Sequence, residues 1–167
     1  MKILISLSSP ELDVIKFTGT HGCYSAVTPD ADSKALLSAV AHMLGVETDP
    51  DKLHCTVMYS KVAPKKGIGC NRQRVRKATV SQITHWDGHD NKGYLVALLD
   101  SPELQEEHAR LKTLGCQPTF DDYKPHITLY AGIKMTPELQ ATIDSVMSAM
   151  PADIELDLTN QFIGDLS

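Results

Sequence analysis

Two short stretches of this 167-residue chain carry side chains suited to acid–base chemistry. A histidine, a threonine two residues later and then an apolar residue occur at His54 and Thr56, and again at His126 and Thr128. Side chains alternate between the two faces of a β-strand, so residues i and i+2 point the same way. Each stretch, as a strand, therefore presents one imidazole and one hydroxyl on a single face.

Two imidazoles and two hydroxyls in one cleft would suit the cleavage of a phosphodiester. A neutral histidine can take a proton from the nucleophile, and a protonated one can give a proton to the leaving oxygen. The hydroxyls of Thr56 and Thr128 can donate hydrogen bonds to the non-bridging phosphate oxygens, where negative charge builds up. Because side chains supply every part of this chemistry, we expect no metal and no other cofactor.

Two rival kinds of site fit the same residues less well. A metal site would need a His-x-His pair or a nearby carboxylate, and neither stretch has one. A cysteine nucleophile would use Cys55, which strand alternation turns away from His54. The other histidines show no paired pattern and are interpreted as surface or structural residues: His21, His42, His85, His89 and His108.

Three helices and six strands are predicted to position these residues. The first helix follows Thr28-Pro29-Asp30, the second opens at Ser101-Pro102-Glu103 with the serine as N-cap, and the third opens at Thr136-Pro137-Glu138. They end near Gly45, Gly115 and Pro151. The strands are predicted at residues 23–28, 53–60, 76–86, 93–100, 126–131 and 154–162, with a hairpin loop at 87–93.

The interspersed strands and helices indicate an α+β fold of two pseudo-symmetric lobes, with antiparallel sheets lining a central cleft and helices outside. The repeated motif supports two lobes, because its histidines are 126 − 54 = 72 residues apart, about one half-domain. Residues 1–21 fit this pattern poorly and are interpreted as an N-terminal extension or an extra edge strand. Residues 22–167 form the predicted single domain.

The composition favours a small substrate. The net charge is −5, whereas proteins that hold long nucleic acids usually carry a basic face. The basic stretch at residues 61–77 is interpreted as a solvated loop, with a phosphate-attracting rim as the alternative. We expect no membrane partner, because no apolar run reaches the length of a membrane span. Four cysteines without a CxxC pair, and no secretory signal, predict free thiols in the cytoplasm.

The paired motif resembles the two-histidine (2H) phosphoesterase superfamily. A closer resemblance, to the phage anti-CBASS phosphodiesterases, runs from about residue 22 to 132. It rests on residues 52–60 (KLHCTVMYS), 98–102 (LLDSP), Leu114-Gly115 and 120–129 (FDDYKPHITL). The His-x-Thr pairs are common to the superfamily, and the last segment and the DSP helix start are more specific.

The resemblance implies that the chain degrades cyclic di- and trinucleotides, the signals of the bacterial CBASS defence, in the infected host cell. The implied reaction is attack by a ribose 2′-hydroxyl on the neighbouring 3′ phosphorus, with His54 and His126 as the acid–base pair. Tyr24 and Trp86 look like the family's base-stacking positions, and Glu155 aligns with a glutamate that contacts a base. The motifs leave open the oligomeric state, the preferred bases and which histidine is the acid.

Three alternative functions are weighed. The same motifs suit an RNA-end 2′,3′-cyclic phosphodiesterase or a 2′,5′-oligonucleotide phosphodiesterase. A protein of another class, which sequesters a cyclic nucleotide without cutting it, is disfavoured because it needs no acid–base pair.

Overall fold

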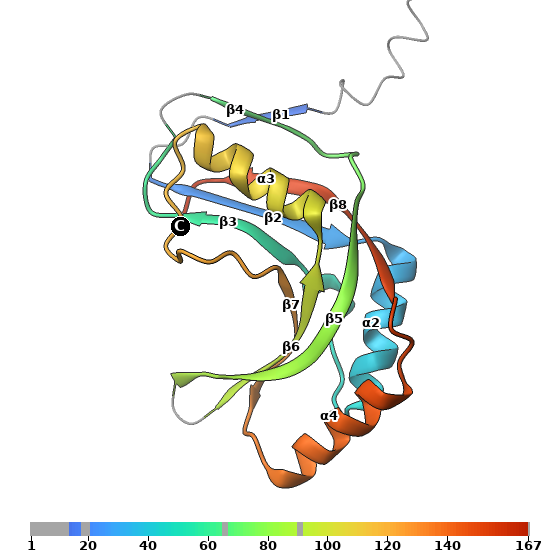
Figure 1. The fold of residues 1–167 in the computed structure, drawn as a ribbon. Coiled ribbons are helices and arrows are strands. Elements are labelled where there is room, and N and C mark those ends of the chain that lie inside the picture. Colours follow the sequence, from blue (N-terminus) through green and yellow to red (C-terminus); the bar gives the residue numbers. More distant parts are fainter. Residues whose placement is uncertain (1–13, 18–20, 65–66, 90–91, 167) are drawn as a thin grey trace, which may run out of the picture.

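The computed structural model describes residues 14–17, 21–64, 67–89 and 92–166, and within them the chain has an α+β fold. Six strands are hydrogen-bonded, every neighbouring pair antiparallel, into a closed sheet in the order β2-β3-β7-β6-β5-β8 (Figure 1). These strands are β2 (Cys23–Pro29), β3 (Cys55–Ser60), β5 (Arg76–Asp87), β6 (Gly93–Asp100), β7 (His126–Ile133) and β8 (Glu155–Gly164).

Three α-helices pack against this sheet in the described part of the chain. They are α2 (Ala31–Met43), α3 (Pro102–Thr113) and α4 (Pro137–Ala149), and a short 3₁₀-helix, η2 (Pro50–Lys52), precedes β3. Helix α3 packs on β3 and β5, α4 packs on β5, and α2 contacts β2, β7 and β8 (Figure 1). None of the described helices is long and apolar enough to cross a membrane.

The predicted helix starts are confirmed by their caps. The side chains of Asp30, Ser101 and Thr136 each accept a hydrogen bond from the backbone N–H three residues later, at 2.9, 3.1 and 3.1 Å. Such caps satisfy N–H groups that have no partner within the helix. The local signals in the sequence were therefore sufficient to locate where each helix begins.

The basic stretch differs from the predicted loop. Residues Ile68–Asn71 form a short strand, β4, paired with β1 (Val14–Phe17) in a second, two-stranded sheet. The paired strand lies within the predicted N-terminal extension, and Phe17 is buried in the core. Because the partner of β4 is more than fifty residues away in sequence, no local pattern indicates the pairing. Within the predicted extension and the basic stretch, residues 1–13, 18–20 and 65–66 lie outside the described part of the chain.

Helix α3 is anchored by a buried polar cluster. The carboxylate of Glu107 accepts hydrogen bonds from Arg110 at 2.6 and 2.8 Å and from Gln161 of β8 at 2.8 Å, and lies 3.6 Å from the Arg76 guanidinium of β5. Burial alone would raise the pKa of Glu107, but hydrogen bonds from Arg110 and Gln161 outweigh it and lower that pKa. An ionised Glu107 thus ties α3 to both strands.

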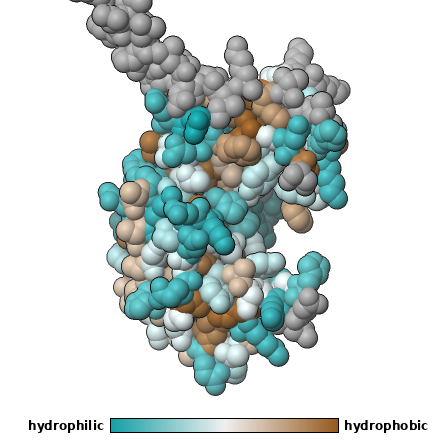
Figure 2. Space-filling view, turned by 180° about the vertical axis from the view of Figure 1, so that it is seen from behind, coloured by the Kyte–Doolittle hydropathy of each residue, from teal (hydrophilic) through white to brown (hydrophobic). Residues whose placement is uncertain are grey.

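The face seen in Figure 2 is mostly polar, with a notch on one side. Figure 2 shows the notch on the right of the rear view, between the upper and lower parts of the molecule. The upper part carries α3, β3 and the segment before β7, and the lower part carries the β5–β6 hairpin (Figure 1).

Candidate active site

The two motif histidines are held in the same way by the backbone. Nδ1 of His54 donates a hydrogen bond to the carbonyl oxygen of Lys52 at 2.8 Å, and Nδ1 of His126 donates to that of Lys124, also at 2.8 Å. Because a carbonyl can only accept, each Nδ1 must carry a proton. Nε2 is therefore the nitrogen of each ring that is free to exchange protons.

The strands that carry the two motifs meet at a single residue pair. Cys55 of β3 is paired with Ile127 of β7, and both side chains are fully buried. Extending this antiparallel register by one residue places Thr56 opposite His126, and His54 opposite Thr128. His54 immediately precedes β3 rather than lying inside it, because η2 ends only two residues earlier. The tertiary structure thus brings both motifs together.

The two predicted aromatic residues lie beside different motifs, Tyr24 beside the first and Trp86 beside the second. The hydroxyl of Tyr24 is 3.4 Å from Oγ1 of Thr56, within hydrogen-bonding distance. The ring of Trp86, on β5, packs edge-on against the ring of His126, with a centroid distance of 4.4 Å and an angle of 63°. Both residues are only partly buried.

The structure places Glu155 elsewhere. It is exposed at the start of β8, opposite Thr79, and its carboxylate lies 3.3 Å from Nζ of Lys77. It is not one of the residues that line the cleft described below.

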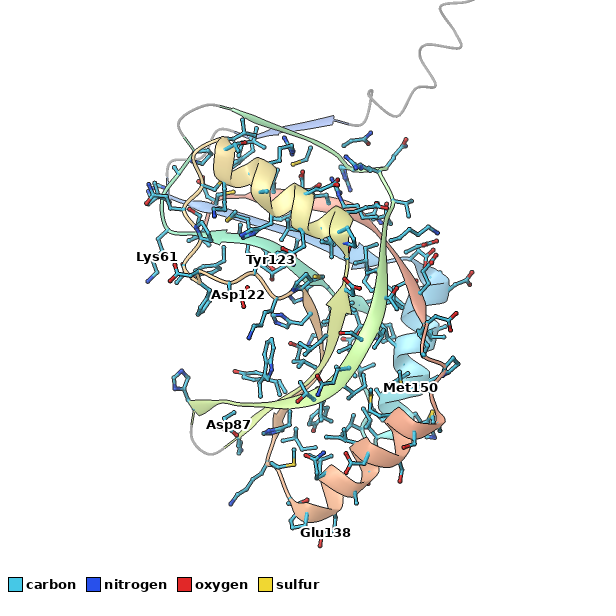
Figure 3. All side chains as sticks on the ribbon, in the orientation of Figure 1. Lys61, Asp87, Asp122, Tyr123, Glu138 and Met150 are labelled. Carbon is cyan, nitrogen blue, oxygen red and sulfur yellow. The ribbon has the colours of Figure 1, made fainter. Side chains whose placement is uncertain are left out.

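A cleft of about 1230 Å³ opens beside Thr56 and His126. Ligand pockets commonly measure about 300–1,000 Å³, so this one has room for a ligand of several rings. One wall comes from the end of β5, with Trp86 and Asp87; the other comes from β3 and the segment before β7, with Tyr123. Asp87 and Asp122 extend from opposite sides of this opening (Figure 3). His54 and Thr128 do not line the cleft.

Two further aromatic side chains in the cleft were not among the predicted site residues. Phe120 is 73% exposed although it is apolar, and Tyr59 is 42% exposed. The backbone N–H of Thr119 donates to the Tyr59 carbonyl at 3.1 Å, which fixes the chain next to Phe120. The sequence signal for Phe120 was its place in the FDDY run, just before the second motif.

Three histidines interpreted as surface or structural residues also line the cleft: His85, His89 and His108. His108 of α3 is buried and stacks on Tyr123, and His85 of β5 donates from Nε2 to the Ile133 carbonyl at 2.8 Å. Both are held by the protein itself, so their interpretation as structural residues stands, but both shape the walls of the site.

The charges in the cleft are mixed. Asp87, Asp121, Asp122 and Lys124 all line the cleft, and Nζ of Lys124 is 3.9 Å from the Asp122 carboxylate. The predicted basic rim is not formed by Arg76 or Lys77, since the first is buried against Glu107 and the second is ion-paired with carboxylates of β8. Among the described residues, no three or more His, Cys, Asp and Glu side chains gather as a metal site would require.

Cys55 is excluded as a nucleophile by its surroundings. Its side chain is fully buried, and burial raises the pKa of its thiol to about 12. A thiol reacts as the thiolate, which is scarce at neutral pH with such a pKa. The burial of Cys55 agrees with the prediction that it turns away from His54, and the prediction that the four cysteines are free is confirmed.

Comparison with known proteins reveals one consistent similarity. Residues 21–161 match the family model described as "Anti-CBASS protein Acb1". The chain is 30% identical over 153 residues to a protein of that name from Vibrio phage KVP40, covering 90% of this chain and 91% of that one. It is 30% identical over 135 residues to the one from Escherichia phage RB16 (77% and 70% covered), and 37% identical over 78 residues to the one from Salmonella phage S16 (47% and 49% covered).

Proposed function

Because the chain belongs to the anti-CBASS protein Acb1 family, we propose that it is a phosphodiesterase that cleaves the 3′–5′ bonds of cyclic di- and trinucleotides. These molecules are the signals of CBASS, and the family name implies counter-defence by a phage. The protein would act inside the infected bacterial cell, where the signal is made. The duplicated motif further supports membership of the 2H phosphoesterase superfamily and its two-lobed, pseudo-symmetric fold.

One observation carries the catalytic proposal. Two Lys-x-His-x-Thr segments approach each other at the β3–β7 junction, and the lysine carbonyl fixes Nδ1 of the histidine in both. Each Nε2 is thereby left to act as acid or base. A protein that only stores its ligand would not need two histidines whose rings are anchored in the same way.

The proposed reaction uses only groups of the chain and the substrate. One histidine takes the proton from the ribose 2′-hydroxyl, whose oxygen then bonds to the adjacent phosphorus. The other histidine protonates the 5′ oxygen as its bond to phosphorus breaks. The product is a linear oligonucleotide that ends in a 2′,3′-cyclic phosphate, so no water is consumed in this step. Thr56 and Thr128 would hold the non-bridging oxygens, as donors to the growing negative charge.

The bases are proposed to stack in the cleft. Trp86 lines the cleft and lies against His126. Tyr24 is not among the residues that line the cleft, but its hydroxyl lies 3.4 Å from Oγ1 of Thr56, which does line it, so Tyr24 would stack on a base at the edge of the cleft. Base–aromatic stacking tolerates different bases, because every base has a π-face. Phe120 offers a further exposed ring on the other wall. Glu155, which pairs with Lys77, would have to leave that lysine to contact a base.

A direct test uses labelled cyclic dinucleotide, the protein and excess EDTA, followed by chromatography. We expect conversion to linear product at the same rate with and without EDTA, because the acid and the base are side chains. The pH–rate profile should be bell-shaped, since one histidine must be neutral and the other protonated. A rate that collapses in EDTA and returns with added metal would contradict the mechanism.

The same experiment separates the alternative functions. Tight binding without product would indicate a protein that sequesters the nucleotide. Inert cyclic dinucleotide, together with turnover of an RNA-end 2′,3′-cyclic phosphate or of a 2′,5′-linked oligonucleotide, would indicate one of the other two phosphodiesterases.

The threonines should matter less than the histidines. Thr56→Val and Thr128→Val each remove one donor to the phosphoryl oxygens while keeping the shape of the side chain. The loss should be about 2–4 kcal/mol of transition-state stabilisation, seen in kcat/KM for the cyclic dinucleotide. Thr142→Val, on α4 and outside the cleft, removes a hydroxyl that donates to the Glu138 carbonyl within the same helix and is the matched control. Negligible effects at both motif threonines would remove them from the site.

A further inference from the structure

The junction between the two motif strands is the weakest in the closed sheet. β3 and β7 share one residue pair, whereas β2 and β3 share five and β6 and β7 share six. The two halves of the proposed active site lie on either side of this junction. Their relative position therefore depends on contacts other than a strand ladder.

Tyr123 crosses the junction. It lies three residues before His126, and its hydroxyl donates a hydrogen bond of 2.8 Å to the carbonyl oxygen of Thr56 on β3. The same hydroxyl is 4.0 Å from Sγ of Cys55. The segment that leads into one motif is thus bonded to the backbone of the other, at the residue whose side chain faces the phosphate in the proposed reaction.

His108 of α3 holds Tyr123 in place. The two rings are stacked, with centroids 4.2 Å apart and an angle of 5° between their planes. Nδ1 of His108 donates to the carbonyl oxygen of Val57 at 2.7 Å, next to the carbonyl that Tyr123 holds. Two successive peptide groups of β3 are therefore fixed, one from α3 and one from the segment before β7.

The Tyr123 hydroxyl remains a donor over the whole range in which the enzyme would work. Burial, with the nearby Cys55 as a further cause, raises the pKa of Tyr123 above its ordinary value. A neutral phenol can donate its proton to a carbonyl, whereas a phenolate cannot.

We propose that Tyr123 is a positioning residue, which sets Thr56 against the scissile phosphate by holding the Thr56 peptide group across the β3–β7 junction. It touches no reacting atom. It fixes the peptide plane from which the Thr56 side chain projects, and His108 fixes Tyr123 in turn. This inference rests on the proposed function, because it assigns Tyr123 a role in that reaction.

The test is a double-mutant cycle that joins Tyr123→Phe to Thr56→Val. Phenylalanine keeps the stack on His108 and removes only the hydroxyl. We expect Tyr123→Phe to lower kcat for a cyclic dinucleotide by about 3- to 10-fold, the range of one neutral hydrogen bond, with KM nearly unchanged. In the Thr56→Val background the same change should cost nothing further, because the group that it positions is already gone.

Two further variants serve as a control and as a second test of the role of Tyr123. Tyr130→Phe, at a half-exposed tyrosine of β7 whose hydroxyl makes no hydrogen bond within the described residues, should leave kcat unchanged. His108→Asn retains a donor for the Val57 carbonyl but removes the ring stacked on Tyr123. It should also lower kcat in the wild-type background and not in Thr56→Val, which tests the idea even if Tyr123→Phe does not fold.

A purely structural tyrosine gives a different pattern. It would lower the melting temperature with kcat unchanged, or its effect on kcat would simply add to that of Thr56→Val; either result overturns the inference. Failure of the proposed function is recognised separately, since full activity of variants at His54 and His126 would reject the mechanism whatever Tyr123→Phe does.

Discussion

Replacing His54 or His126 by alanine should lower kcat for a cyclic dinucleotide by about 10²–10⁴-fold, the usual cost of losing a general acid or base. His54→Asn and His126→Asn should lose as much, although asparagine can place an amide N–H where Nδ1 was. That amide can keep the hydrogen bond to the Lys52 or Lys124 carbonyl, so these variants remove Nε2 and little else.

The measurement is steady-state turnover together with the melting temperature. His42→Ala is the matched control: His42 is exposed on α2, paired with Glu47, and outside the cleft, so its loss should leave kcat unchanged. His126→Ala also removes a contact with Trp86 and should raise KM, whereas His54→Ala should not. Near-wild-type turnover in either asparagine variant, with the fold intact, would reject the two-histidine mechanism.

A substrate with 2′-deoxyribose or 2′-O-methylribose at the cleaved position should bind but resist cleavage. In the proposed reaction the nucleophile is the substrate's own 2′-hydroxyl, held beside the phosphorus by the ribose itself, and this proximity is a large part of the rate. Removing it leaves water, which would need both positioning and activation. We expect no product from the analogue during complete turnover of the ribose substrate, with dissociation constants within a few-fold.

Early products distinguish the two nucleophiles. Mass spectrometry should find a 2′,3′-cyclic phosphate on the first product, without oxygen-18 from labelled water. In a wholly 2′–5′-linked ring the hydroxyl next to each phosphate is the 3′-hydroxyl, which would have to attack in a different pose, so this ring should be a poor substrate. Solvent oxygen in the first product, or rapid cleavage of the deoxy analogue, would mean that water attacks. The activities of the His54 and His126 variants would then decide whether the two histidines are still catalytic.

The helices and most strands of this protein could be predicted because their signals are local. Asp30, Ser101 and Thr136 cap the helices at the predicted places, and the predicted strand at residues 93–100 coincides with β6. A capping side chain reaches only three residues along the chain, and strand alternation involves only nearest neighbours. Such patterns are complete in the sequence itself.

The chemistry of the candidate site was also determined locally. The spacing of His126 and Thr128 places both side chains on one face of β7, whereas His54 lies just before β3, so the same rule does not fully apply to His54 and Thr56. The same alternation turns Cys55 into the core, where it is fully buried.

Only the tertiary structure decided what surrounds these groups. The β1–β4 pairing, the burial of Arg76 against Glu107, the contact of Trp86 with His126 and the bond from Tyr123 to Thr56 each join residues 25 or more positions apart. Such partners are chosen by how the closed sheet and its helices pack as a whole, because no periodicity in a short window specifies which distant strand or side chain will be the neighbour. The sequence by itself thus predicted which groups could do chemistry, and the fold determined which of them meet.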